Sequence, residues 1–217
     1  MFIRKFLKDT DGAAMVEFTI IAMLALTFLL GAVDFFFAFS QWNSVVKAVE
    51  RGARIAAVST PVDNGLRNLT GLVSGVNQPG DPMPAYYFSI ICQGASTSGG
   101  SCTGTRAGTY NASAMNQIVY GRGGSLSCTD ATSAYSVGMC DIYSRITPAN
   151  VTVEYQQTGL GFVGRPGGPV PTVTVSIRNL SFEFFFLNSL LRFGPIQMPP
   201  ISATVTGEDL FSSAPAS

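Results

Sequence analysis

The feature that most constrains this chain is an apolar run over residues 13–33, in which Glu17 is the only ionisable side chain. A helix of this length covers roughly 30 Å, which matches the hydrocarbon core of a bilayer. The run therefore predicts a membrane-spanning helix. A carboxylate inside the membrane costs about 2.5–3.5 kcal/mol on insertion scales, so Glu17 is expected to have a partner or a purpose.

The flanks of the run predict its orientation. Arg4, Lys5 and Lys8 precede it, and Lys and Arg beside a span stay on the cytoplasmic side. The N-terminus is therefore expected in the cytoplasm, and the rest of the chain across the membrane. Asp34 and the aromatic-rich segment ending at Trp42 mark the predicted membrane exit. The sequence leaves open whether Asp34 is solvated there or pairs with a neighbouring subunit.

Three interpretations of the run compete: a simple anchor, a cleaved secretory signal and a prepilin-type signal. A secretory signal has a shorter apolar region of about 7–15 residues. The position of Glu17 favours the prepilin type. A cut after Gly12 would free the amine of Ala13, one helical turn from Glu17. The positive end of the helix also favours the carboxylate, and Gly12 would let the chain extend into a protease cleft.

The block GAAMVEF, residues 12–18, resembles the processing site of type IV and Flp-type prepilins, in which a Gly is followed five residues later by Glu. The resemblance implies recognition of Gly12, Ala13, Glu17 and Phe18 by a prepilin peptidase. One departure is Phe18, which stands where the major Flp pilin usually carries Tyr. The chain is also far longer than that small pilin, so the match is to a minor branch.

Residues 29–58 resemble the TadE-like family, the pseudopilins of the tight-adherence pilus. The resemblance rests on Gly31, Asp34, Trp42 and the motif GARIA at 52–56, in the family's order and approximate spacing. It implies a structural subunit with no enzymatic activity. The implied partners are the prepilin peptidase, other pilins and pseudopilins bound through the N-terminal helix, and the inner-membrane assembly platform.

This interpretation divides the chain into a leader (1–12), a transmembrane and pilin-like helix (13–60) and a periplasmic α+β domain (61–217). The expected location is the inner membrane, with a single span and the C-terminal domain in the periplasm. Whether the subunit enters an extracellular pilus is left open. The main alternative is an uncleaved, signal-anchored periplasmic adaptor of the secretion machinery.

The remaining sequence predicts an antiparallel sheet with short helices. Apolar residues at three- and four-residue spacing extend the first helix to about residue 58. Strands are expected at 86–92, 151–155, 173–177 and 201–205, the last three alternating with Thr and Ser in a sheet that is wet on one side. Other expected elements are short helices at 66–73, 111–121 and 139–146, an exposed loop at 93–108, and an apolar segment at 182–194. That segment is expected to cover the sheet as a helix or loop, with a re-entrant membrane contact as the alternative.

Four cysteines, Cys92, Cys102, Cys128 and Cys140, all follow the membrane segment. The chain has no histidine, so a mixed Cys/His zinc site cannot form, and the paired spacing of a four-cysteine site is absent. Two disulfides in an oxidising periplasm are the better interpretation. Three connectivities are open, and the local pairs Cys92–Cys102 and Cys128–Cys140 are favoured because each would close a Gly/Ser-rich loop.

Other function classes find little support. The absence of histidine excludes mechanisms that use imidazole as a base. The net charge of zero gives no basic surface of the kind that binds nucleic acid. The motif GLGFVG at 159–164 is followed by RPGGPVP, which cannot form the helix that a dinucleotide site needs. A kinase loop would need a later lysine, and none follows Lys47. The motif is interpreted as a hairpin loop, and no catalytic, cofactor or metal site is predicted.

Overall fold

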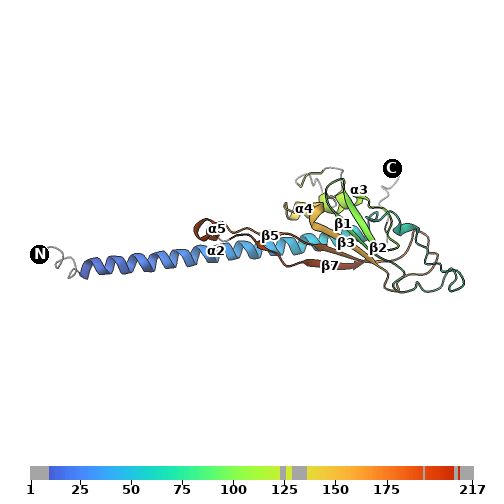
Figure 1. The fold of residues 1–217 in the computed structure, drawn as a ribbon, viewed down its shortest axis with the longest axis horizontal. Coiled ribbons are helices and arrows are strands. Elements are labelled where there is room, and N and C mark those ends of the chain that lie inside the picture. Colours follow the sequence, from blue (N-terminus) through green and yellow to red (C-terminus); the bar gives the residue numbers. More distant parts are fainter. Residues whose placement is uncertain (1–9, 123–125, 129–135, 193, 208–209, 211–217) are drawn as a thin grey trace. The chain divides into compact units, whose positions relative to one another are not determined.

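The computed structural model describes residues 10–122, 126–128, 136–192, 194–207 and 210 (Figure 1). They form two compact units. The first contains the described residues up to Gln41 together with Phe182–Ile196, and the second contains Trp42–Ser181 and the residues from Gln197 onward. Helix α2, Thr10–Ala57, contributes to both. The fold class is α+β, with a long apolar helix followed by an antiparallel sheet, as the sequence predicts.

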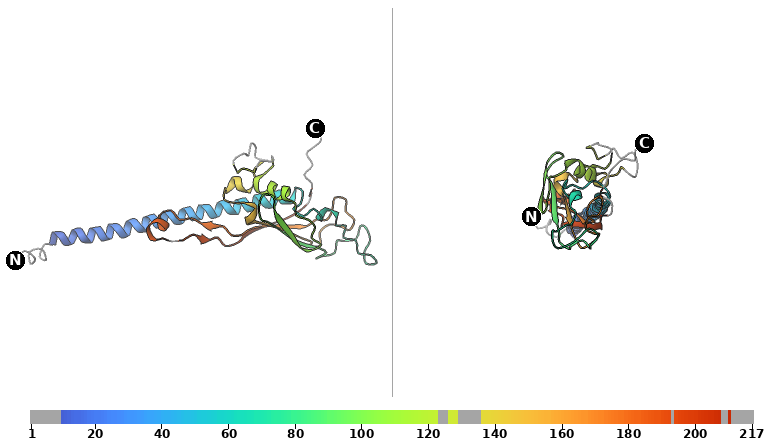
Figure 2. Two further views of the ribbon diagram at one scale, coloured as in Figure 1. Left: turned by 45° about the horizontal axis from the view of Figure 1, so that its top comes forward. Right: turned by 90° about the vertical axis from the view of Figure 1, so that its right-hand side faces the viewer.

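Helix α2 has 48 residues and confirms the long helix expected from the apolar periodicity. Its C-terminal turns belong to the second unit, where Val45, Val49 and Ala53 are fully buried. The helix ends shortly before Pro61, which disfavours helical geometry in the residue before it. The views of Figures 1 and 2 show these turns running beside the sheet of the same unit.

The sheet has five antiparallel strands in the order β2-β1-β3-β4-β7. The strands are β1 (Ser89–Gly94), β2 (Gly100–Thr105), β3 (Val151–Gln156), β4 (Thr172–Ile177) and β7 (Ile201–Thr206). The three strands predicted from period-two alternation are therefore confirmed, with bounds that differ by a residue. The strand expected at 86–92 begins and ends later, as β1.

One face of the sheet forms the core of the second unit. The strand register aligns two rows of buried side chains across β1, β3 and β4: Ile90, Tyr155 and Val173, and then Cys92, Val153 and Val175. The segment after α2 meets the same face, because the Val62 N–H donates to the Tyr155 hydroxyl at 3.0 Å. On β4 the alternate residues are Thr and Ser and are only half-buried, which agrees with the expected one-sided sheet.

The short helices follow the predicted positions with different lengths. They are η1 (Leu66–Asn68), α3 (Ala112–Tyr120), α4 (Met139–Ile142), η2 (Pro148–Asn150) and α5 (Phe186–Leu191). The α3 prediction is confirmed at both ends, since Asn111 caps its start by accepting from the Ala114 N–H and Gly121 ends it with φ of 85°. Helix η1 is one turn where a longer helix was expected, and α4 ends at Ile142 because Tyr143 is already extended.

The prediction of an exposed loop over 93–108 is wrong, because β2 lies within it and pairs with β1 along its whole length. Gly, Ser and Thr at an exposed sheet edge leave no apolar alternation, so the periodicity gave no signal. The prediction at 159–164 is confirmed: this segment belongs to the loop between β3 and β4. Gly159, Gly161 and Gly164 have positive φ there, which favours glycine.

The prediction that residues 182–194 cover the sheet is also wrong. These residues belong to the first unit and contact the N-terminal part of α2. The described ones, 182–192 and 194, form a hairpin together with residues 195–196, hereafter the 182–196 hairpin. Its two stems are β5 (Ser181–Phe182) and β6 (Ile196–Gln197), and its tip is α5. The physical reason is the carboxylate of Asp34 on α2, which accepts hydrogen bonds from backbone N–H groups of this segment. The sequence pattern gave no indication that these two segments are in contact.

Candidate functional site

The N-terminal part of α2 is covered with exposed apolar side chains. Phe28 is 82% exposed and Phe18 71%, and the helix is long and apolar enough to cross a membrane. The large apolar residues exposed on this part are Met15, Val16, Phe18, Ile20, Ile21, Met23, Leu24, Leu26, Phe28, Leu29, Val33, Phe35, Phe36, Phe37 and Phe39. A helix that is apolar around its whole circumference needs lipid or protein on all sides.

The hydroxyls of Thr19 and Thr27, the two threonines within residues 13–33, are satisfied within the helix. Thr19 donates to the Met15 carbonyl at 2.7 Å, and Thr27 donates to the Met23 carbonyl at 2.8 Å. Such back-bonding removes the penalty of bringing a free hydroxyl into hydrocarbon. These two threonine side chains are therefore compatible with a lipid environment.

The predicted processing residues Gly12, Ala13, Glu17 and Phe18 all lie on α2, and Glu17 and Phe18 are exposed. A Cβ placed on Gly12 would meet no atom within 4 Å. No hydrogen bond or ion pair joins Glu17 to another described residue. Arg4, Lys5, Lys8 and most of the predicted leader lie outside the described residues.

Asp34 has a role that sequence reasoning did not find. Its side chain is fully buried, and its carboxylate accepts the backbone N–H groups of Phe185 at 3.1 Å, Phe186 at 2.9 Å and Leu187 at 2.7 Å. These are the first N–H groups of α5, which have no partner inside the helix. Asp34 is thus neither solvated nor available to a neighbouring subunit, and both expectations for it are corrected.

A signal for this contact existed in the sequence of the hairpin. The N-cap residue of α5 is Phe185, which offers no side-chain acceptor, because Ser, Thr, Asp or Asn is absent there. An uncapped helix in an apolar segment calls for an acceptor from elsewhere in the chain. The separation of 151 to 153 positions between donor and acceptor kept the pair from being recognised.

Further contacts join the hairpin to α2 in a consistent order. Leu187 lies against Gly31, the Phe35 and Phe184 rings meet edge to face at 6.1 Å, and Gln41 Nε2 donates to the Glu183 carbonyl at 3.5 Å. The hairpin tip therefore lies near Gly31 and its stem near Gln41, about 15 Å apart along the helix axis. The smallness of Gly31 gives the tip room to approach. Trp42 belongs to the second unit and is half-buried.

The cysteines divide into two pairs with different states. Cys92 and Cys102 form a disulfide that joins β1 to β2. Cys128 and Cys140 are free thiols, and the Cys128 thiol donates to the Ser144 carbonyl at 3.9 Å. Burial raises the pKa of the Cys140 thiol, and the contact with Cys128 raises it further. The expected bond between Cys128 and Cys140 is absent here and stays a prediction for the oxidised protein.

One acidic and sulfur cluster does not make a metal site. Asp63 lies close to Cys92 and Cys102, but both sulfurs are consumed by the disulfide. The Asp63 carboxylate instead accepts from the Gly65 N–H at 2.8 Å and the Gly108 N–H at 2.6 Å. Its role is therefore to hold two loops together.

The fold and the exposed helix define a chain with one apolar N-terminal helix suited to membrane anchoring, followed by an α+β domain. Residues 12–54 match the family model described as TadE-like protein. This confirms, over the matched segment, the resemblance drawn from the sequence. No curated protein and no solved structure matches the chain.

Proposed function

We propose that this protein is a structural pseudopilin of a tight-adherence pilus, cut after Gly12 by a prepilin peptidase. The observation that carries the proposal is the family match, which begins at residue 12, the residue before the expected cut. The exposed apolar surface of α2 supports the proposal further, because such a surface can contact lipid before assembly and pack against neighbouring helices afterwards.

Glu17 is the residue on which assembly depends in this proposal. It lies exposed on an apolar surface and has no described partner, so its charge is available to another group. After cleavage the nearest new cation is the amine of Ala13, four residues earlier on the same helix face. The pair can form within one subunit or between adjacent ones, which offsets the cost of a lone carboxylate in the membrane.

The proposed partners follow from this arrangement. The peptidase recognises the segment from Gly12 to Phe18 at the cytoplasmic face. Other pilins and pseudopilins pack on the exposed apolar turns of α2, and the second unit meets the inner-membrane assembly platform from the periplasm. The protein has no enzymatic role in this proposal.

The processing step is tested by mass spectrometry of the N-terminus in cells with and without the peptidase. The mature protein is expected to begin at Ala13, and Gly12→Leu is expected to block the cut. Because a Cβ at position 12 would meet no atom within 4 Å, the block would report recognition and not misfolding. Gly31→Ala is the matched control, since its Cβ makes only an ordinary contact at 3.8 Å with Leu187.

The role of the charge is tested separately with Glu17→Gln, which keeps the shape and removes the charge. Pilus formation is expected to fall although the protein still reaches the membrane. Glu50→Gln is the control, because Glu50 is an exposed carboxylate on the same helix but in the second unit. Normal piliation with Glu17→Gln would contradict the assembly role.

The uncleaved adaptor is the alternative that the same measurement separates. An adaptor would retain its first twelve residues in the presence of the peptidase, whereas the pseudopilin would lose them. Retention together with normal pili would overturn the proposal.

A further inference from the structure

The 182–196 hairpin continues the apolar surface of the membrane helix. Phe185 is 65% exposed and Phe186 41%, and on the adjacent part of α2 Phe36 is 73% exposed and Phe39 64%. These rings extend the exposed apolar surface of α2 beyond the Val33 end of the expected span. Exposed aromatic side chains in such number are unfavourable in water and suit a membrane interface.

The hairpin also meets the main requirement for entering a membrane, which is that its backbone polar groups have partners. The three N–H groups at the start of α5 would be unsatisfied in a free loop, and each would be costly in hydrocarbon. The buried carboxylate of Asp34 accepts all three. The negative charge of Asp34 and the unpaired N–H groups at the start of α5 thus satisfy each other inside the protein. Neither has to contact lipid.

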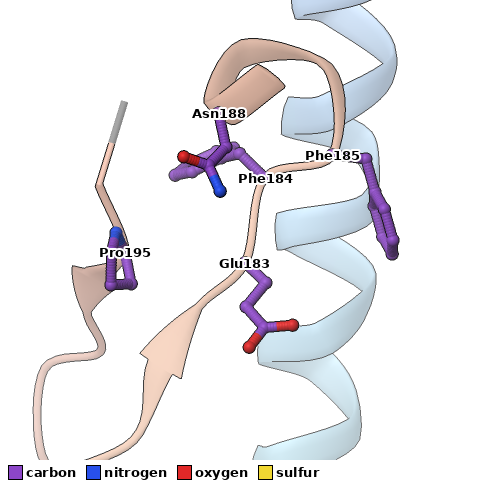
Figure 3. Close-up of a pocket in the computed structure, with 5 residues that line it drawn as sticks. All are labelled: Glu183, Phe184, Phe185, Asn188 and Pro195. Atoms are coloured by element: carbon purple, nitrogen blue, oxygen red, sulfur yellow. The ribbon is translucent and has the colours of Figure 1, made fainter. Parts of the chain in front are cut away.

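The few polar side chains of the hairpin are consistent with a shallow position. Figure 3 shows Phe184 and Asn188 directed into the space that the hairpin encloses, with Pro195 across from them. Glu183, Phe184, Phe185, Asn188 and Pro195 line a pocket of about 390 Å³ there. This lining mixes rings with an amide and a carboxylate, as expected at the boundary between acyl chains and headgroups.

Arg192 gives a reason to choose lipid as the occupant of this surface. It is exposed directly after α5, and no carboxylate among the described residues pairs with it. Its long side chain can reach outward from the hairpin tip to a phosphate at the bilayer surface while the apolar residues stay in the acyl region. An anionic headgroup satisfies the charge and the apolar rings at the same time.

We propose that the 182–196 hairpin is a second membrane contact, inserted in the outer leaflet beside α2, with Phe185 and Phe186 among the acyl chains and Arg192 at an anionic headgroup. The proposal rests on the proposed function, since it requires α2 to span the membrane. It assigns to Asp34 the role of a positioning residue that allows a loop to lie at this depth.

The test uses tryptophan fluorescence of the full chain reconstituted in vesicles of phosphatidylcholine and phosphatidylglycerol, with some lipids brominated on their acyl chains. Trp42 is the only tryptophan, so Trp42→Phe provides a silent background. Phe186→Trp then reports the hairpin. Phe28→Trp, 82% exposed on α2, reports the span, and Phe162→Trp, 46% exposed in the second unit, is the control outside the membrane.

The expected result is quenching at positions 186 and 28 and none at position 162. Position 186 should respond most to bromines near the headgroup end of the chains, and position 28 to bromines nearer the bilayer centre. Quenching at 28 without quenching at 186 would overturn the hairpin proposal alone and would indicate that another subunit covers these rings. Absence of quenching at 28 would overturn the proposed membrane span, and the hairpin proposal with it.

Arg192→Gln tests the headgroup contact. Quenching at position 186 is expected to be stronger with phosphatidylglycerol than with phosphatidylcholine alone, and Arg192→Gln should remove that difference. Arg178→Gln, at an exposed arginine of the second unit, should retain it. An unchanged lipid dependence with Arg192→Gln would overturn the assignment of Arg192. Phe185→Trp repeats the depth measurement on the same hairpin if Phe186→Trp does not fold.

Discussion

Asp34 links two segments that lie far apart in the sequence, and its removal has a local and measurable consequence. In Asp34→Ala, three part-buried N–H groups lose their acceptor, which costs up to about 1–3 kcal/mol for each donor that stays shielded from water. The hairpin is therefore expected to open more often. Hydrogen exchange at the amides of Phe185, Phe186 and Leu187 should become faster by about tenfold or more, because 1.4 kcal/mol corresponds to a factor of ten.

Asp34→Asn should give an intermediate rate, because its one carbonyl oxygen retains part of the bonding. Asp81→Ala is the matched control: the Asp81 carboxylate also accepts a backbone N–H, from Gln78 at 2.7 Å, but it is exposed and lies in the second unit. It should leave exchange in the hairpin unchanged. Equal exchange in Asp34→Ala and the unmodified protein would show that the cap does not hold the hairpin.

Tyr155 is the residue in the sheet core with the clearest pH dependence. Burial raises the pKa of its hydroxyl above the ordinary value of 10.0, with the nearby Asp63 adding to the shift and the Val62 N–H opposing it. Below about pH 10 the hydroxyl is protonated in both the folded and unfolded chains. Above that pH the unfolded chain loses the proton first, so the contribution of Tyr155 to the free energy of unfolding falls as pH rises.

Tyr155→Phe is expected to lower the free energy of unfolding by about 1–3 kcal/mol at neutral pH, because the buried Val62 N–H loses its acceptor. Urea denaturation at several pH values is the measurement. The difference between the two proteins should shrink above pH 10, and Tyr86→Phe, at a tyrosine 77% exposed, should show neither effect. A difference that grows with pH would contradict the assignment.

The elements that the sequence predicted are those whose own residues carry a complete signal. Helix α2 has an apolar run and a stripe that continues it, α3 has a cap at Asn111 and a stop at Gly121, and β4 alternates Val with Thr and Ser. Each pattern follows from local geometry, so no knowledge of distant contacts was needed. The processing residues Gly12, Ala13, Glu17 and Phe18 stay a prediction, although the chemistry proposed for them also lies within one or two helical turns.

The elements that the sequence missed depend on partners elsewhere in the chain. Strand β2 is a strand because β1 offers it hydrogen bonds and a disulfide, while its own Gly, Ser and Thr favour no structure. The hairpin is placed by Asp34, whose chemistry alone suggested a solvated or intersubunit carboxylate. Long-range pairing of this type cannot be predicted from periodicity. It is the reason why residues 182–194 contact α2, although the sequence predicted that they cover the sheet.

Strand β2 consequently depends on its disulfide more than the other strands do. Replacing both Cys92 and Cys102 with Ser is expected to lower the free energy of unfolding by about 2–4 kcal/mol, because the unfolded chain regains the freedom that the bond restricts. Urea denaturation with and without a reductant measures this. Reduction of the unmodified protein should reproduce the double variant, whereas Cys128→Ser should change little. A double variant as stable as the parent would show that pairing with β1 alone holds the strand.

At the scale of the whole molecule, the two units differ sharply in their surfaces. Most of the exposed large apolar side chains of the described residues belong to the first unit, where they lie on α2 up to Phe39 and on the hairpin at Phe185, Phe186 and Ile196. The second has a buried core behind the one-sided sheet, with only scattered exposed apolar residues such as Val76 and Leu126. Isolated residues of this kind are normal on a water-soluble surface, whereas a continuous apolar surface is not.

The second unit is therefore expected to fold in water without the first. A chain that begins at Trp42 and replaces residues 182–196 with Asn-Gly keeps all five strands and the buried turns of α2. A short turn can join the two ends, because the chain segments on either side of residues 182–196 lie close together: the Met198 N–H donates to the Leu180 carbonyl at 2.7 Å. Size-exclusion chromatography without detergent should give a monomer, and thermal unfolding should be cooperative.

The matched control begins at the same residue but retains residues 182–196. Because the exposed rings of the hairpin are then its main apolar surface, this longer chain should float with phosphatidylglycerol vesicles or associate with itself, while the shorter chain should do neither. If the shorter chain fails to unfold cooperatively, the second unit needs the first for its stability. If both chains remain monomeric and free of vesicles, the apolar hairpin has too little affinity for lipid when α2 is not there to hold it at the membrane.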